Sequence, residues 1–135
     1  MTTTEFAWDD DLALLRRLSS SNRRPNLMVL CSGKESDRMA LAFRTFSEPP
    51  FHTCRLPGPL ELPWAGRGTL MLENASALTL QQQMALHDWI ERADRGTQII
   101  SMSAEPLYPL VLDGRFLEGL FYRLNVVTID ATANA

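Results

Sequence analysis

The sequence predicts an α/β domain in which helices cover both faces of a five-stranded parallel sheet. Three observations favour this three-layer class. The chain of 135 residues has the size of one domain. Apolar runs of strand length alternate with amphipathic helical patterns, and the connections between them are mostly short. We therefore treat residues 1–135 as a single domain whose strands are joined by right-handed crossovers.

The first half of the chain is expected to contain two helices and two strands. Leucines at helical spacing behind three aspartates predict a helix over 9–18. The apolar run NLMVLC at 26–31 predicts a strand, and after the polar turn SGKESD the pattern predicts a helix over 37–46. Residues 47–67 are rich in proline, and their one extended piece, FHTCRL at 51–56, is expected to form the second strand.

The second half continues the alternation of strands and helices. In order, we expect a strand over 69–73, a helix over 80–93, a strand over 97–103, helical segments over 106–113 and 115–124, and a strand over 125–130. The run TLMLE at 69–73 is apolar up to its last residue, which is typical of a strand that helices bury on both faces. Gly96 closes the long helix as a C-cap, and Gly114 separates the two short helical segments.

The composition indicates a soluble globular protein, which we expect to be cytoplasmic. Hydrophobic residues make up 45% of the chain and charged residues 21%, with a net charge of −3. The sequence contains no apolar run of the roughly 18 to 20 residues that a membrane span needs, and its acidic start lacks a signal-peptide core. Cys31 and Cys54 have no metal-binding spacing, so we expect two small buried hydrophobic residues.

A local basic group raises the question of nucleic-acid binding. It consists of Arg16, Arg17, Arg23 and Arg24. Aromatic residues are not interleaved with these arginines, and no recognition-helix pattern follows them. We interpret the group as a solvated helix end, where arginines interact favourably with the helix dipole, and expect no direct contact with DNA.

Two long stretches carry a family resemblance. GTLMLENASALTLQQQMALHDWI (68–90) is similar to the Walker B segment and the following helix of the AAA+ ATPase domain of sigma-54-dependent transcriptional activators, also called the sigma-54 interaction domain. GRFLEGLFYRLNVVTI (114–129) is similar to that family's GRFREDLYYRLNVV segment. TQIISMSAEPL (97–107) resembles the family's sensor I strand more weakly, and VLCSGKESDRMALAFR (29–44) resembles its Walker A segment. The resemblance implies a P-loop NTPase-like (AAA+) core.

The Walker A segment of this chain is degenerate. A P-loop binds phosphates through glycine-rich backbone amides and a lysine. Ser36 falls where the family's lysine belongs, Gly33 is the one glycine kept, and the loop is one residue shorter, so Lys34 reaches the site only along a different path. The resemblance implies that a nucleotide, if one binds, contacts Ser32, Gly33, Lys34, Ser36 and Asp37. The favoured alternative is that Ser32 and Lys34 are simply turn residues.

The Walker B pair of the family becomes Glu73 and Asn74. Glu73 can still hold Mg²⁺, because that role needs only a carboxylate; the alternative is a carboxylate capped by neighbouring amides. Asn74 cannot act as a general base, and losing that base typically costs about two to four orders of magnitude in rate. We therefore assign no catalytic residue.

Two further family positions are also altered. Ser103 and Ala104 replace the Thr-Asn pair of sensor I. Of the two finger arginines that reach a neighbouring subunit in the family, Arg123 is kept and Leu117 replaces the other. The alternative for Arg123 is a surface ion pair with Glu118 or Asp113.

Larger family features are missing from the sequence. The sequence has no room for the helical hairpin that carries the sigma-54-contacting GAFTGA loop, and we expect the domain to lack the family's helical lid and DNA-binding helix-turn-helix. Apolar surface is expected where these parts are lacking, with Trp64, Phe121 and Tyr122 as candidates to cover it. His52 and His87 have no partner at recognisable spacing, and we expect both to be structural.

Three functional hypotheses follow. The first is a truncated, non-hydrolysing AAA+ domain that acts in transcription regulation by binding protein, with sigma-54 activator subunits or a second copy of itself as partners and no resident cofactor. The second is a nucleotide-sensing or weakly active ATPase in which Lys34 replaces the displaced lysine and ATP and Mg²⁺ bind. The third is a stand-alone domain of a larger regulatory system with an unrelated partner.

Overall fold

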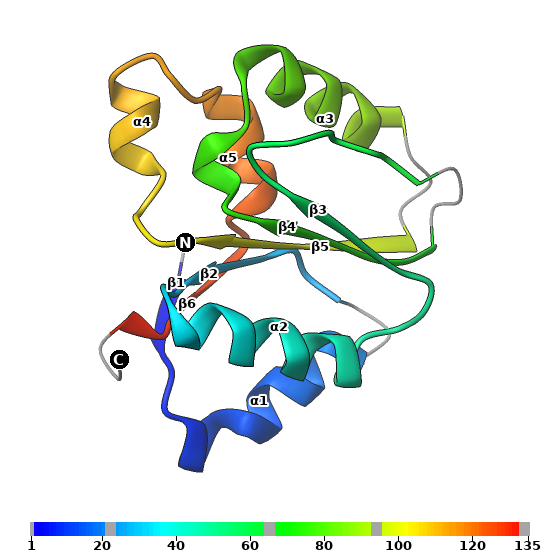
Figure 1. Ribbon diagram of the computed structural model, residues 1–135, viewed down its shortest axis with the longest axis vertical. Helices are drawn as coiled ribbons and strands as arrows, with labels where there is room; N and C mark the ends of the chain where they lie inside the picture. Colours follow the sequence, from blue (N-terminus) through cyan, green and yellow to red (C-terminus); the bar gives the residue numbers. More distant parts are fainter. Residues whose placement is uncertain (1, 21–23, 64–66, 93–95, 133–135) are drawn as a thin grey trace.

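A computed structural model describes residues 2–20, 24–63, 67–92 and 96–132. One sheet lies between two layers of helices (Figure 1). Helices α1 (Trp8–Ser20) and α2 (Lys34–Phe46) cover one face, and α3 (Leu80–Arg92), α4 (Tyr108–Leu112) and α5 (Glu118–Leu124) cover the other. The prediction of a three-layer α/β fold is confirmed.

The sheet has six strands, all of them parallel. They are β1 (Thr2–Glu5), β2 (Leu27–Leu30), β3 (Phe51–Arg55), β4 (Arg67–Glu73), β5 (Gly96–Ser103) and β6 (Val127–Asp130). Their order across the sheet is β1-β6-β2-β5-β4-β3. Because neighbouring strands are parallel, every connection between them has to cross over the sheet, and the helices bury its central strands on both faces.

The prediction of five strands missed β1. This strand reads TTTE, has no apolar run, and lies at the edge of the sheet, where only one side needs a partner. It pairs with β6 from Thr2 opposite Val127, and the ladder continues where the amide of Phe6 donates to the carbonyl of Asp130 at 2.8 Å. Phe6 is fully buried directly after the strand, so tertiary packing rather than local pattern holds β1 in place.

Two helix boundaries also differ from the predictions. Helix α2 begins at Lys34, three residues earlier than expected, because only Ser32 and Gly33 form the turn after β2 and Cys31. The predicted helix over 115–124 is confined to α5, since the amide of Arg115 instead donates to the carbonyl of Leu110 in a closed turn. A turn of 3-10 helix at Ala75–Ala77 joins β4 to α3.

Side chains of the central strands alternate between two apolar clusters, one on each face of the sheet. In β4, Leu70 and Leu72 pack under α3 and α5, and Met71 packs on the opposite side against α1 and α2. All three are completely buried, as predicted for a strand covered on both faces. Burying a side chain of this size contributes about 1.5 to 3 kcal/mol, so each of these strand residues stabilises the fold substantially.

Two glutamines at the start of α3 connect it to the rest of its layer. Thr79 and Gln82 form a reciprocal capping box, with the two side chains bonded to each other's backbone amides at 3.1 and 3.0 Å. Gln83 is buried, accepts a hydrogen bond from the amide of Leu117 at 2.8 Å, and donates to the carbonyl of Arg115 at 3.1 Å. The segment that precedes α5 is therefore fixed to α3.

Within the described parts of the chain, no helix has both the length and the apolar character that crossing a bilayer requires.

Candidate functional site

A pocket of about 210 Å³ opens where β2, β4 and β5 end. It is lined by Cys31, Ser32, Gly33, Ser36, Glu73, Asn74, Met102, Ser103 and Ala104. The carboxyl ends of parallel strands are the usual place for ligand sites in α/β proteins. The fold thus brings together the three segments that resemble Walker A, Walker B and sensor I. Lys34, Asp37 and Arg123, which the sequence also suggested, do not line this pocket.

The loop after β2 uses several of its amides internally. The amide of Cys31 donates to the carbonyl of Ser103 at 3.0 Å, and the amides of Glu35 and Ser36 donate at 3.1 Å to the carbonyls of Ser32 and Gly33. Gly33 has a φ of 57° and a ψ of −129°, a conformation that glycine adopts more easily than other residues. These three amides are therefore unavailable to a phosphate.

Lys34 and Asp37 point out of the pocket region. Lys34 is exposed at the first position of α2 and forms no hydrogen bond or ion pair with another described residue. Asp37 is exposed too and lines a neighbouring pocket of about 180 Å³ together with Ala40, Leu41, Arg44, Arg55 and Glu73. Among the described lysine and arginine side chains, none lines the pocket at the ends of β2, β4 and β5.

The Walker B positions have specific partners. Glu73 has 18% of its side chain exposed, and its Oε2 accepts a hydrogen bond from Nε of Arg55 at 2.9 Å. The partner of Glu73 is thus a guanidinium rather than the neighbouring amides of our alternative. Asn74 has a left-handed backbone, with φ 64°, and its side-chain amide donates to the carbonyl of Leu56 at 3.0 Å. In the described ranges, no group of three or more His, Cys, Asp or Glu residues is placed to hold a metal ion, and Mg²⁺ on Glu73 stays a prediction.

Two further hydroxyls of the pocket, those of Ser103 and Ser36, are bonded within the chain. The hydroxyl of Ser103 donates to the carbonyl of Glu105 at 2.6 Å, and the hydroxyl of Ser36 donates to Sγ of Cys31 at 3.6 Å. Burial raises the pKa of the Cys31 thiol, the hydrogen bond from Ser36 opposes that shift, and the negative charges of Glu35 and Glu73 add to it. Cys31 is therefore a neutral thiol at physiological pH, and both cysteines are buried as expected.

Arg123 lies in the last turn of α5, and its carbonyl accepts a hydrogen bond at 2.9 Å from the side chain of Asn26, just before β2, so it lies near the end of the sheet where β2 begins rather than beside the pocket. It forms an ion pair with Glu91 of α3. The partners that we expected for a structural role were wrong, because Asp113 pairs with Arg115 at 3.2 Å instead and Glu118 is exposed. Of the residues expected to cover apolar surface, Phe121 is buried and Tyr122 is exposed, while Trp64 lies outside the described residues.

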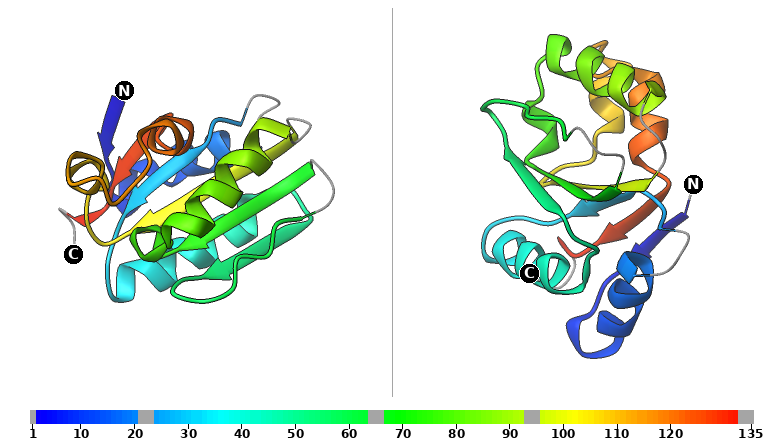
Figure 2. Two further views of the ribbon diagram at one scale, coloured as in Figure 1. Left: turned by 90° about the horizontal axis from the view of Figure 1, so that it is seen from above. Right: turned by 90° about the vertical axis from the view of Figure 1, so that its right-hand side faces the viewer.

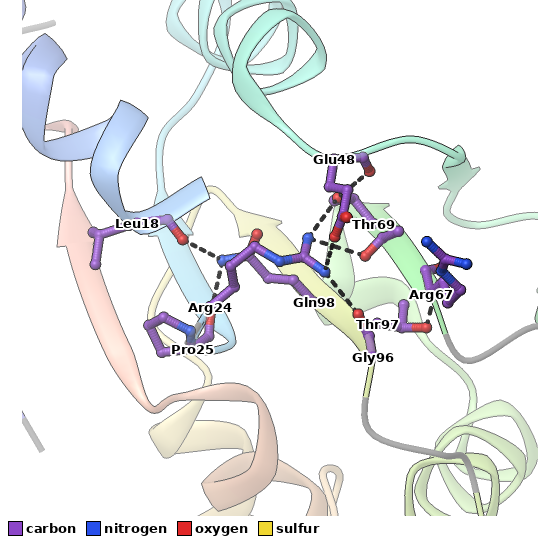
Figure 3. Close-up of polar contacts among 10 residues, drawn as sticks. Leu18, Arg24, Pro25, Glu48, Arg67, Thr69, Gly96, Thr97 and Gln98 are labelled. Atoms are coloured by element: carbon purple, nitrogen blue, oxygen red, sulfur yellow. Dashed lines mark hydrogen bonds and ion pairs between the residues drawn. The ribbon is translucent and has the colours of Figure 1, made fainter. Parts of the chain in front are cut away.

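The interpretation of Arg24 as part of a solvated helix end is wrong. Its side chain is 9% exposed and bridges the beginnings of β4 and β5 (Figure 3). The guanidinium donates to the carbonyls of Gly68 at 3.1 Å and Gly96 at 2.7 Å, and it pairs with Glu48 at 2.8 Å. Sequence spacing gave no signal for these contacts, since the acceptors lie far along the chain and two of them are backbone carbonyls. Arg16 and Arg17 are exposed on α1, and Arg23 lies outside the described residues.

A cluster beside the pocket was also missed. The indole N–H of Trp8 donates to Oε2 of Glu35 at 2.7 Å, and the guanidinium of Arg38 lies 3.9 Å from the centroid of the Trp8 ring. This cluster fixes the start of α1 to the first turn of α2 and engages the carboxylate of Glu35. Trp8 and Glu35 are not part of a recognisable sequence motif, so their contact is seen only in the tertiary structure.

The architecture, with a parallel sheet between two helical layers and a pocket at the strand ends, belongs to the class of P-loop NTPase folds. Comparison with protein-family models gives no match, and neither does comparison with curated proteins. Solved structures do match. NtrX from Brucella abortus in complex with ATP superposes with a TM-score of 0.72 and 22% identity over 91% of this chain, and its complex with ADP does so with 0.69 and 22% over 90%.

A shorter solved structure covers the same region. The P-loop NTPase domain of a sigma-54 transport activator from E. coli matches 91% of this chain and 98% of its own length, with a TM-score of 0.62 and 20% identity. The chain spans only 35% to 36% of the two NtrX structures. At these identities the likeness establishes the fold, and it confirms the predicted AAA+ fold of sigma-54 activators.

Proposed function

We propose that the chain is a non-hydrolysing AAA+ domain that works by binding protein in transcription regulation. One observation carries this proposal: the pocket at the ends of β2, β4 and β5 contains the carboxylate of Glu73, and no lysine or arginine within the described part of the chain lines it. A polyphosphate carries several negative charges, and binding it needs cations or free amides. The pocket offers the wrong sign of charge for that ligand.

The side chains at the positions that hydrolysis would need are also hydrogen-bonded to other parts of the chain. Asn74 stands where a general base would be needed, and its amide is bonded to Leu56. The hydroxyl of Ser103 at the sensor position donates to Glu105 within its own turn. The pocket therefore contains no base, activating lysine or free sensor group that could position and activate a water molecule for attack on a phosphate.

The α3–α5 layer supports a protein-binding role. Its outer surface exposes Tyr108, Leu112 and Tyr122, and Leu80 and Met84 are exposed on α3. Most of the exposed large hydrophobic residues thus lie on this layer, where α3 and α5 lie side by side over the sheet (Figure 2). Contiguous exposed apolar surface marks interaction sites, and this layer is where the exposed apolar residues are most numerous. By resemblance, α5 corresponds to a subunit contact of sigma-54 activators, so we propose such subunits, or a second copy, as partners. A subunit without catalytic groups would cap or poison a ring of active subunits.

Titration calorimetry with ATP and Mg²⁺ tests the absence of nucleotide chemistry. We expect no heat of binding at nucleotide concentrations of about 100 μM, and no release of phosphate above the buffer rate. The matched variant is Lys34→Ala, which is expected to behave identically because Lys34 points out of the pocket. Micromolar binding that Lys34→Ala abolishes would overturn the proposal in favour of the nucleotide-sensing alternative.

That alternative has one structural observation in its favour. The amides of Gly33 and Lys34 form no hydrogen bond with a described residue, and they lie at the N-terminus of the 13-residue helix α2, whose dipole favours an anion. The short loop and the acidic neighbours weaken this site compared with a glycine-rich loop.

The partner surface is tested by binding to purified sigma-54 activators. We expect the chain to bind an activator subunit and to lower its ATPase rate, and we expect Tyr122→Ala to weaken binding roughly tenfold, since exposed aromatic residues often dominate interfaces. Tyr122 is 53% exposed, so the fold should be unaffected. Leu41→Ala on α2, where the side chain is 66% exposed on the opposite layer, is the control and should bind normally. If the chain neither binds an activator nor changes its ATPase rate, the choice of partner is wrong.

A further inference from the structure

Helices α3 and α5 run side by side in the same direction over the sheet (Figure 2). Three contacts join α3 to α5 or to the turn before it, each between residues 32 positions apart in the chain: Gln83 with the carbonyl of Arg115, His87 with Gly119, and Glu91 with Arg123. The constant separation shows that the two helices are parallel and in register along their line of contact.

The outer side of this helix pair exposes apolar side chains on both sides of the contact line. Leu80 and Met84 lie one turn apart on the stripe of α3 that also carries His87, and each is at least half exposed. Tyr122, also more than half exposed, lies one turn after Gly119 on α5. Gly119 is itself exposed and has no side chain, so the contact line between the helices is open to solvent there. Leu80, Met84, Gly119 and Tyr122 define the surface that we call the α3–α5 face.

The size of the α3–α5 face suits one helix better than a second copy of the chain. Helix α3 has 13 residues and is about 20 Å long, and packed helices lie about 8 to 10 Å apart, so the face covers on the order of 400 Å². A stable protein–protein interface buries about 800 Å² on each partner. A single helix of about three to four turns covers a face of this size, and a flexible methionine such as Met84 adapts readily to such a partner.

Electrostatics favours one direction for a docked helix. The dipoles of α3 and α5 point the same way, so a third helix is stabilised when it runs antiparallel to both. Its last turn then lies beside the first turn of α5, which carries Glu118. Glu118 is exposed and has no ion-pair partner among the described residues. A lysine or arginine in the last turn of the docked helix complements both Glu118 and that helix's own dipole.

We propose that the α3–α5 face binds one amphipathic helix of a protein partner, antiparallel to α3 and α5. Apolar residues of the partner at i, i+3, i+4 and i+7 pack on Leu80, Met84 and Tyr122. Its backbone approaches most closely at Gly119, and a basic residue of its last turn pairs with Glu118. The inference rests on the proposed protein-binding function and deepens it, because it states which kind of element the partner presents.

Three peptides with blocked ends and identical composition test this proposal by chemical-shift changes of the chain's amides. QLAQLLAQLAKLLK has the apolar stripe and lysines in its last turn, KLAKLLAQLAQLLQ has the same stripe and lysines in its first turn, and LQLALQLAKLAQLK has no helical stripe. We expect the first to bind with a Kd on the order of 100 μM and to shift Met84, Gly119 and Tyr122 but not Leu41 on the opposite layer. The second should bind about three- to fivefold more weakly, and the third at least about tenfold more weakly.

Gly119→Gln separates docking from folding. A Cβ atom here would meet only the ring tip of His87, 3.3 Å away, and 37% of that side chain is exposed, so it can move aside. Because glutamine is the better helix former, the midpoint of thermal unfolding should stay the same or rise, whereas affinity for the first peptide should fall about tenfold or more. Ala85→Gln adds the same side chain at an exposed position of α3 off the stripe, and it should change the affinity less than about twofold.

Glu118→Arg tests the direction of the docked helix. Lysines in the first turn also lower the helicity of the free peptide, but that effect is the same for every variant of the chain. In Glu118→Arg, the preference for the first peptide over the second should therefore shrink at least about threefold. A preference that Glu118→Arg leaves unchanged would contradict the antiparallel direction and the pairing with Glu118.

Two outcomes would overturn the docking face itself. One is that the chain does not bind the striped peptides or binds the unstriped peptide equally well, and the other is that Gly119→Gln binds as the unchanged chain does. If the chain still binds a sigma-54 activator and lowers its ATPase rate, the proposed function survives either result. Nucleotide binding in the calorimetric test, in contrast, would refute the proposed function without changing the result for the peptides.

Discussion

Gly68→Ala is expected to lower the free energy of unfolding by roughly 3 to 5 kcal/mol. Gly68 has a φ of +82°, and a Cβ atom at this position would lie 2.1 Å from the carbonyl oxygen of Pro50. That oxygen also accepts the amide of Thr69 at 2.9 Å, so relief of the clash breaks a hydrogen bond next to β3 and β4. The loss of stability can be measured by urea unfolding followed by far-UV circular dichroism.

Gly114→Ala is the matched control for this prediction. Gly114 also has a positive φ, +73°, but a Cβ atom there would meet nothing within 4 Å. Its loss of stability should be about 1 kcal/mol, which is the backbone cost alone. Equal losses for the two variants would contradict the close approach of Pro50.

Arg24→Ala is expected to cost roughly 3 kcal/mol, because it removes a buried cation that holds several groups together. The carbonyls of Gly68 and Gly96 would lose their guanidinium donor, and Glu48 would lose its ion-pair partner. The change should lower the midpoint of thermal unfolding and speed hydrogen exchange at the starts of β4 and β5 before the rest of the sheet.

Arg92→Ala provides the comparison for Arg24. Arg92 pairs with Asp88 one turn earlier on α3, and both side chains are exposed, so the expected loss is below about 0.5 kcal/mol. A small effect of Arg24→Ala, similar to that of Arg92→Ala, would restore the interpretation of Arg24 as a solvated residue.

The candidate site could be predicted only in part. Contiguous motifs identified the segments around Gly33, Glu73 and Ser103, and the fold places all three around one pocket. Lys34 stands next to Gly33 in the sequence, yet it does not line the pocket, because α2 begins at Lys34 and directs that side chain to solvent. The partners of Glu73 and Arg123 were missed, since Arg55 and Glu91 come from other elements and ion pairs across elements leave no periodic signal.

The sequence by itself determined the layered class of the fold, because the spacing of apolar residues in runs such as 69–73 and in the amphipathic helices indicates which side chains are buried. It also predicted which phosphate-handling groups of the family are replaced, since those positions lie within contiguous motifs. Only the tertiary structure decided that polar TTTE forms an edge strand, that Arg24 is buried, and that Lys34 lies outside the pocket lining. These features depend on which distant groups meet, and a residue's type does not encode its partner.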